Sequence, residues 1–177
     1  MEAASRGEPW AFEYLVGRYQ GALINYFLRH TGNIEAAKEL SQEVFLRLYT
    51  ARHRYRPEAK FTTYLFTIAH NLVINEVFVK KRPESTIDPD EALDAAPSAN
   101  DGPEDSLIAN EEKKRVTDAL LRLNARERSV LIMKYTEEMS YAEIGEATGT
   151  SVPAIESLLS RAKEKMRKSL KRSAKEA

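Results

Sequence analysis

The chain has 177 residues, 42% of them hydrophobic and 31% charged, and no formal net charge, which fits one domain or two small ones. It has no cysteine, which excludes a disulfide framework and a thiolate metal site. The N-terminus lacks the pattern of a secretory signal, and no apolar run approaches the roughly 20 residues that span a bilayer. We therefore expect a cytoplasmic protein with no membrane insertion.

Charge is unevenly distributed along the chain. Residues 1–82 carry 12 Lys and Arg and 8 Asp and Glu, a net charge of +4. Residues 83–112 carry 10 Asp and Glu and no basic residue, and residues 113–177 carry 15 basic and 9 acidic residues, a net charge of +6. Two basic blocks are thus separated by an acidic one, and such blocks favour a polyanionic partner such as nucleic acid.

Residues 1–82 predict an N-terminal domain of three helices. Apolar residues recur at three- and four-residue steps from Phe12 up to a break at 31–33, then over 34–55, and again over 61–82. Three helices of this length are expected to form a compact bundle.

The remaining chain predicts a linker and a second helical domain. Residues 83–112 hold four prolines and few large apolar residues, a composition too polar to bury a core. We assign them to a flexible acidic linker and residues 113–177 to a C-terminal domain. Its four helices are expected over about 105–122, 125–135, 141–148 and 152–172. Neither block shows the period-two alternation of strands, so the expected fold is all-α.

The segment GEATGTSVPAIES, residues 145–157, predicts two helices joined by a tight turn. Proline is accepted in the first turn of a helix, so Pro153 marks a helix start with Ser151 as its N-cap. Gly149 falls where the preceding helix ends, in the left-handed conformation that glycine adopts at little cost. That preceding helix opens with a capping box, Ser140 to Glu143. This spacing is typical of a helix-turn-helix, a DNA-binding motif.

The second helix of this motif carries side chains that could read DNA. Its N-terminal residues would face base edges in the major groove, where Arg161 can donate to guanine and Glu156 can accept from cytosine. Ser157 and Ser160 share this outward face. A charged amphipathic helix can also be no more than a solvated face. The basic stripe that could meet phosphates comprises Arg161, Lys165, Lys168 and Arg172.

A second group of candidates surrounds the start of the third N-terminal helix. Tyr55, Phe61 and Tyr64 alternate with basic residues, and aromatic faces stack on unpaired bases while Arg and Lys hold the backbone. Asn71, on the same helix, offers a donor and an acceptor to an exposed base. Aromatic residues on helices are more often core residues, which we favour for Phe61 and leave open for Tyr64. The interleaved basic residues are Arg52, Arg54, Arg56 and Lys60.

Catalytic chemistry finds little support in the sequence. His30, His53 and His70 share no short metal-ligand spacing, and the chain has no glycine-rich phosphate loop, H-E-x-x-H or G-x-S-x-G motif. We therefore expect a protein that is not an enzyme and holds no metal and no cofactor.

The two groups of candidates, in this order, resemble the extracytoplasmic-function (ECF) sigma factors of the bacterial sigma-70 family. The segment ELSQEVFLRLYTARHRYRPEAKFTTYLFTIAHNLVINEVFVKKRP is similar to region 2, the promoter-melting domain. The segment LNARERSVLIMKYTEEMSYAEIGEATGTSVPAIESLLSRAKEKMRKSL is similar to region 4. The resemblance covers most of the chain, and it implies a non-catalytic protein that binds core RNA polymerase and directs it to promoters.

The resemblance also implies roles for particular residues. The core-polymerase surface, which docks on the clamp helices of the β′ subunit, would comprise Glu39, Gln42, Glu43 and Arg47. The minus-10 surface, which holds a flipped base at Asn71, would comprise Arg56, Lys60, Thr62, Tyr64, His70, Asn71 and Asn75. The minus-35 surface would comprise Ser151, Pro153, Ala154, Glu156, Ser157, Ser160, Arg161, Lys165 and Lys168. The other implied partners are the β flap and an anti-sigma factor, and the implied state is a monomer.

The sequence departs from the family pattern in places. Glu156 and Leu158 stand where Lys or Arg is common, which leaves the promoter sequence open. Only MEAASRGEPW precedes AFEYLV, so we expect a short first helix or a sequence that starts late. In this family the acidic linker would thread the polymerase's RNA exit path, where its charge could act as a surrogate for RNA.

Two other classes of protein remain as alternatives. A helix-turn-helix transcriptional regulator with an N-terminal sensing bundle would bind duplex DNA stably and would not bind core polymerase. A protein-interaction module would bind no nucleic acid, which fits the charge distribution poorly. The regulator leaves the aromatic and basic residues around Asn71 unexplained, so we favour the sigma factor.

Overall fold

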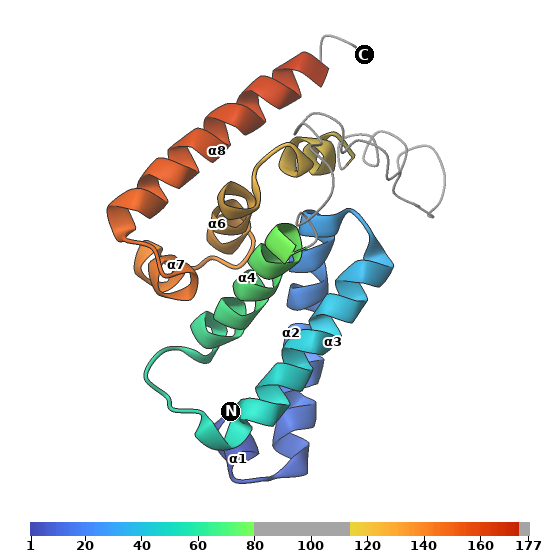
Figure 1. The fold of residues 1–177 in the computed structure, drawn as a ribbon, viewed down its shortest axis with the longest axis vertical. Helices are drawn as coiled ribbons and strands as arrows, with labels where there is room; N and C mark the ends of the chain where they lie inside the picture. The colour runs from blue at the N-terminus through green and yellow to red at the C-terminus, as the bar shows by residue number, and fades with distance from the viewer. Residues whose placement is uncertain (80–113, 174–177) are drawn as a thin grey trace.

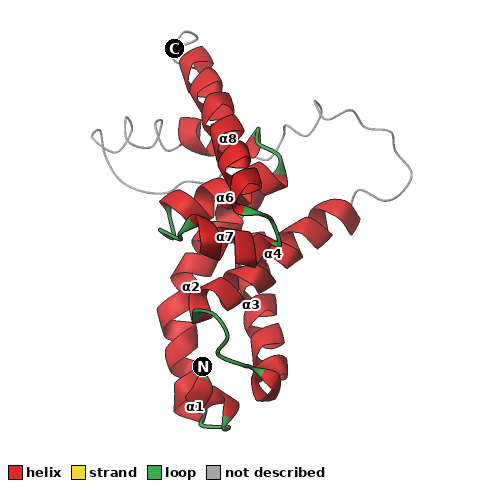
Figure 2. Cartoon of the chain, turned by 90° about the vertical axis from the view of Figure 1, so that its left-hand side faces the viewer, coloured by secondary structure: helices red, strands yellow, loops and turns green. Residues whose placement is uncertain are grey.

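A computed structural model describes residues 1–79 and 114–173 of the chain (Figure 1). Within these ranges every regular element is a helix, as Figure 2 shows, which confirms the all-α fold. The acidic linker, with the first part of the helix expected over 105–122, lies outside the described residues. The N-terminal domain comprises α1 (Glu2–Ser5), α2 (Pro9–Thr31), α3 (Ile34–Ala51), the 3-10 helix η1 (Arg52–Arg54) and α4 (Phe61–Val79). The C-terminal domain comprises a helical segment over 114–121, α6 (Ala125–Tyr135), α7 (Tyr141–Thr148) and α8 (Val152–Ser173).

Local signals set the ends of α2 and α3. Gly32 has a φ of 67°, in the left-handed region, and its N–H donates to the Leu28 carbonyl at 2.8 Å, which closes α2. The Asn33 side chain then accepts from the backbone N–H groups two and three residues on, and caps α3. The helix expected over 34–55 ends earlier, at Ala51, because its last turn tightens into η1, as helix C-termini often do.

Capping signals also set the helices of the C-terminal domain. Ser140 and Glu143 form the predicted capping box, with the Ser140 N–H donating to Glu143 Oε2 at 2.7 Å. Gly149 closes α7 with a φ of 64°, as predicted. The next helix begins at Val152, which leaves Pro153 in its first turn. The helix-turn-helix expected from the sequence is therefore confirmed as local structure.

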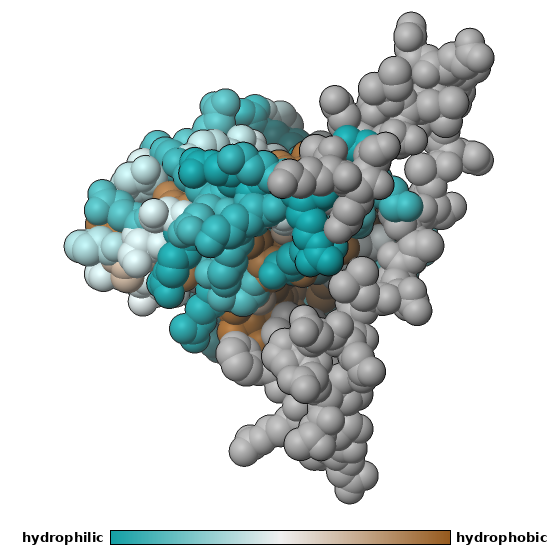
Figure 3. All heavy atoms as spheres, turned by 90° about the horizontal axis from the view of Figure 1, so that it is seen from above, coloured by the Kyte–Doolittle hydropathy of each residue, from teal (hydrophilic) through white to brown (hydrophobic). Residues whose placement is uncertain are grey.

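The two domains share one continuous hydrophobic core. Phe27 and Phe66 of the N-terminal domain belong to the same cluster of buried residues as Ile132 and Ile144 of the C-terminal domain. α4 lies against α6 and α7, and α2 against α6 (Figure 1). The described surface seen from above is mostly hydrophilic (Figure 3), as expected when the apolar side chains lie between the helices. The sequence does not predict this docking of the domains.

Candidate nucleic-acid interface

Backbone contacts hold the turn between α7 and α8. The Thr150 N–H donates to the Gly145 carbonyl at 2.9 Å. A Cβ added to Gly145 would lie 2.7 Å from the Thr150 carbonyl oxygen, so a larger residue would force the backbone of the turn to shift. Ile144 and Ile155 are fully buried and anchor both helices in the core. These contacts fix α8 in the position of the second helix of a helix-turn-helix, which enters the major groove.

The N-terminal half of α8 presents the proposed minus-35 residues to solvent. Ile155, Leu159 and Ala162 form its buried face, and Leu158 and Met166 are half-buried. Ala154 is half-buried at the edge of this face. The exposed members are Ser151, Pro153, Glu156, Ser157, Ser160 and Arg161.

Farther along α8, the basic stripe is tied to acidic side chains of the same chain. Lys165 Nζ lies 2.9 Å from both carboxylate oxygens of Glu127, which is only 1% exposed on α6. Lys168 Nζ lies 2.8 Å from Glu164 Oε1, one turn away. A buried carboxylate is costly unless it is paired, so Lys165 has a structural role that fastens α8 to α6. Sequence periodicity showed the stripe but not this partner, 38 residues away.

A cleft of about 380 Å³ opens beside the start of α4. The rings of Tyr55 and Tyr64 meet there with centroids 5.3 Å apart, and burial raises the pKa of Tyr55. Phe61 is half-buried and packs edge-on against Tyr19 at 5.1 Å, which is the core role favoured for it. The cleft thus combines aromatic and basic side chains, as a site for unpaired bases requires. Its lining residues are Arg54, Tyr55, Arg56, Glu58, Ala59, Thr63, Tyr64, Thr67 and Glu146.

The proposed minus-10 residues lie in two environments. Arg56, Lys60, Asn71 and Asn75 are exposed, and Thr62 and Tyr64 are half-buried. His70, by contrast, is 5% exposed. Burial, and then the charge of Arg126 on α6, lowers the pKa of His70 to about 4. The structure therefore does not bring His70 to the open surface that carries Asn71.

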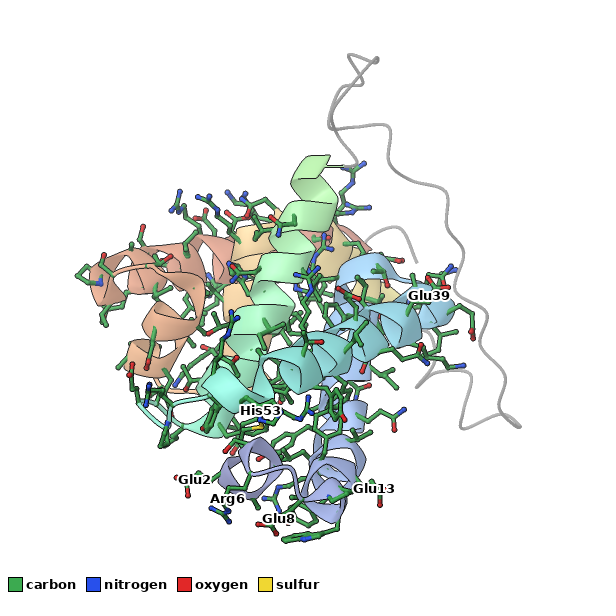
Figure 4. The ribbon with its side chains drawn as sticks, turned by 60° about the horizontal axis from the view of Figure 1, so that its bottom comes forward. Glu2, Arg6, Glu8, Glu13, Glu39 and His53 are labelled. Carbon is green, nitrogen blue, oxygen red and sulfur yellow. The ribbon has the colours of Figure 1, made fainter. Side chains whose placement is uncertain are left out.

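The proposed core-polymerase residues follow one outer face of α3. Glu39, Gln42 and Arg47 are exposed, and Arg47 Nε lies 2.6 Å from the half-buried Glu43. Figure 4 shows Glu39 near the N-terminal end of α3, on the side away from α8. Leu46, 61% exposed, lies one turn from Gln42 on this face. An exposed apolar residue outside the buried periodicity of a helix can be recognised in the sequence, but the predicted core-polymerase residues did not include Leu46.

One buried arginine crosses between the two domains. Arg128, on α6, donates from Nη1 to the His30 carbonyl at the end of α2, at 2.6 Å. Its other donors reach three carbonyls of its own domain at 2.6 to 2.8 Å: Leu120, Leu121 and Leu123. Arg128 therefore neutralises the C-terminal ends of two helices that belong to different domains, where a cation is favourable.

Further polar contacts join the domains. The Tyr26 hydroxyl donates to Ser129 Oγ at 2.9 Å, and His30 Nε2 lies 3.2 Å from the same oxygen. Burial, and then the charge of Arg128, lowers the pKa of His30 well below its ordinary value. At the other end of the interface, Lys60 Nζ lies 2.7 Å from Glu143 Oε1. None of these pairs has a local signal in the sequence.

Other chemistry is not favoured by the described part of the chain. Among residues 1–79 and 114–173, no group of three or more His, Asp or Glu side chains could hold a metal ion. Within the same ranges, no helix combines the length and hydropathy needed to cross a bilayer.

Comparisons with known proteins identify both domains. Residues 15–82 match the family model of sigma-70 region 2, and residues 113–166 match that of sigma-70 region 4. The ECF RNA polymerase sigma factor SigW of Bacillus subtilis is 29% identical, over 97% of this chain and 95% of SigW. The RNA polymerase sigma factor YlaC of the same species is 30% identical, over 94% of this chain and 95% of YlaC.

Solved structures share the fold over nearly the whole chain. CnrH, in complex with the cytosolic domain of CnrY, has a TM-score of 0.67 at 23% identity and covers 95% of this chain and 92% of its own. The sigma factor RpoE of Bartonella quintana, in complex with the anti-sigma factor NepR, has a TM-score of 0.68 at 18% identity, over 91% and 97%. Sigma factors bind core RNA polymerase and promoter DNA. With both regions matched and a relative 30% identical over almost its whole length, the chain belongs to the ECF sigma factors of the sigma-70 family and is a non-enzymatic RNA polymerase sigma factor.

Proposed function

We propose that the two surfaces read the two promoter elements, α8 the duplex minus-35 element and the cleft beside α4 the unpaired minus-10 strand. The observation that carries this proposal is the pairing of Tyr55 and Tyr64 in a cleft lined by Arg54 and Arg56. Flipping a base costs a few kcal/mol, which stacking on aromatic rings and an amide partner can offset. Asn71 lies exposed on α4 about one turn beyond Thr67 of the cleft lining, and it would supply that amide.

Run-off transcription tests this assignment. Bacterial core polymerase, with or without the chain, would transcribe fragmented DNA of the source genome, and the transcript starts would be sequenced. We expect new starts that share two spaced motifs. Asn71→Ala should weaken dependence on the downstream motif and Arg161→Ala on the upstream one. The matched controls are Gln20→Ala and Arg167→Ala, which change exposed residues of the same domains outside the proposed surfaces.

Absence of new starts from a folded chain that fails to bind core polymerase would contradict the proposal. Equal losses in the control variants would contradict the residue roles while leaving the promoter function intact. Lys165 and His70 are not used as probes, because Lys165 is paired with Glu127 and His70 is buried between the domains.

The outer face of α3 is proposed to dock on the β′ clamp helices of core polymerase. Its polar residues surround Leu46, an exposed apolar side chain of the kind that anchors protein interfaces. Leu46→Asp should reduce binding to core polymerase by about tenfold or more. The control Ile34→Asp changes another exposed apolar residue on the same helix, at its first position, where an acidic residue is tolerated. Equal loss in both variants would contradict the assignment.

The remaining partners follow from the family. We propose that the C-terminal domain also contacts the β flap, and that the chain acts as a monomer in the cytoplasm, where core polymerase meets promoter DNA. The RpoE–NepR complex supports an anti-sigma factor as a further partner, because RpoE shares this fold across both domains. Co-purification of the chain from its source, followed by identification of the bound proteins, tests these assignments.

A further inference from the structure

The outward face of α8 has small side chains at its centre and opposite charges on its two flanks. Ser157 and Ser160 lie near the centre, and both are exposed. Glu156 lies on one flank and Arg161 on the other, about 140° apart around the helix and about 7.5 Å apart along its axis. The two serines leave room for the helix to approach base edges, and the two charged residues would meet different bases.

Glu156 is an unpaired negative charge on this face. The other acidic residue of α8, Glu164, receives the ammonium group of Lys168 at 2.8 Å. Within residues 1–79 and 114–173, the Glu156 carboxylate takes part in no hydrogen bond or ion pair. The residues three and four positions away, where a helical ion-pair partner would stand, are all uncharged: Val152, Pro153, Leu159 and Ser160. The described structure therefore gives Glu156 no part in holding α8 in place.

A carboxylate on a DNA-binding face is favourable at few places on a duplex. Phosphate oxygens repel it, so it needs a hydrogen-bond donor on a base edge. In the major groove these donors are the exocyclic amines of cytosine and adenine. Adenine presents its N7 acceptor beside the amine, whereas guanine and thymine present acceptors only. Cytosine alone presents an amine with no acceptor beside it, so the chemistry of Glu156 favours cytosine.

Ser160 extends this preference to the other base of the pair. It follows Glu156 by one helical turn on the same flank, and its hydroxyl can donate to O6 or N7 of guanine. Ile155 and Leu159, which directly precede the two residues, are buried and hold the backbone of both positions against the core. Glu156 and Ser160 therefore present an acceptor and a donor in the order that a C·G pair requires.

We infer that Glu156, together with Ser160, selects a C·G base pair within the minus-35 element. This inference rests on the proposed role of α8 as the reader of that element, and it adds the identity of a base pair. Selection works by repulsion as well as attraction, since guanine or thymine in place of the cytosine would set an acceptor against the carboxylate.

Selection of promoters by the holoenzyme tests the inference. Core polymerase carrying the wild-type chain or a variant would bind a pool of one promoter, found by run-off transcription, whose upstream motif is randomised. The bound DNA would then be sequenced. We expect the wild-type chain to enrich a C·G pair at one position, and Glu156→Ala to weaken that preference about tenfold there. Glu156→Gln should move the preference at the same position to an A·T pair, because a glutamine amide pairs with N6 and N7 of adenine.

The matched control is Glu164→Gln, which removes the same charge about 12 Å farther along α8 and should leave every base preference unchanged. Glu156 is exposed, so its variants should keep the wild-type melting temperature, which circular dichroism checks. A uniform gain in affinity for all sequences, with no position altered, would mean that Glu156 only repels phosphate and would overturn the inference. An equal change in the control would overturn it too.

Single promoters give the same answer as a coupling between one residue and one base pair. Replacing the selected C·G pair by T·A removes the amine and sets the thymine O4 acceptor in its place. This change should weaken holoenzyme binding about tenfold with the wild-type chain and much less with Glu156→Ala. Equal losses with both chains would overturn the inference while leaving α8 as the reader of the element. If the wild-type chain drives no initiation with core polymerase, the proposed function itself fails.

Discussion

The hydrogen bond between Tyr26 and Ser129 allows the docking of the two domains to be measured as a coupling energy. The Tyr26 side chain is fully buried, and its hydroxyl donates to Ser129 Oγ at 2.9 Å across the interface. Ser129→Ala would leave that hydroxyl buried without this acceptor, which should cost about 2 kcal/mol of unfolding free energy. Tyr26→Phe should cost about 1 kcal/mol, because Ser129 keeps His30 as a second partner.

The double variant removes both partners and should cost about 1.5 kcal/mol, about 1.5 kcal/mol less than the sum of the single variants. Urea unfolding at pH 7.5, followed by far-ultraviolet circular dichroism, gives the four free energies. As a control, Tyr14→Phe changes an exposed tyrosine of the same helix and should show no coupling to Ser129→Ala. A coupling of Tyr26 to Ser129 below about 0.3 kcal/mol would refute the docked arrangement, since sites that do not touch are additive to that extent.

Three further outcomes are expected. His30 and His70 have pKa values below 6.5 in the folded chain, so the unfolded chain binds more protons below that pH. The unfolding free energy, measured by urea titration, should therefore be constant near pH 7.5 and lower by about 2.5 kcal/mol at pH 5.5. An unchanged free energy at pH 5.5 would contradict the burial of the two histidines. Lys165→Met should lower the melting temperature far more than Lys165→Arg, since it leaves the Glu127 carboxylate buried and unpaired, and equal melting curves would contradict the structural role. Gly149→Ala, at a φ of 64°, should lower the unfolding free energy by about 1 kcal/mol in urea titrations. An unchanged free energy would contradict the left-handed turn.

The features that the sequence predicted well depend on neighbours in the chain. The helix ends are set by residues that act within one helical turn, so spacing alone predicts them. These residues are Ser140, Gly149 and Pro153. Resemblance to a known family supplied the roles of the surfaces, which spacing could only suggest.

The features that it missed depend on residues far apart in the chain. Arg128 reaches the carbonyl of His30, 98 positions earlier, and Lys165 reaches Glu127 through the tertiary packing of α8 on α6. Helical periodicity marks Lys165 as an exposed basic residue, but periodicity cannot show that the buried Glu127 carboxylate lies within ion-pair distance of its ammonium group. His70 was placed with the DNA-contacting residues because the sequence does not reveal that the second domain covers it.

The hydrogen bond between Tyr26 and Ser129 joins the two domains of one chain. The fraction of molecules with docked domains therefore responds to protein concentration as an intramolecular equilibrium does. An intramolecular equilibrium is unaffected by dilution, so the fraction of open molecules is the same whether a cell makes few copies or many. A molecule that binds the covered face instead shifts the equilibrium in proportion to its own concentration and its preference for the open form. The abundance of such competitors would therefore set how many chains are open, and synthesis of the chain would set only how many exist.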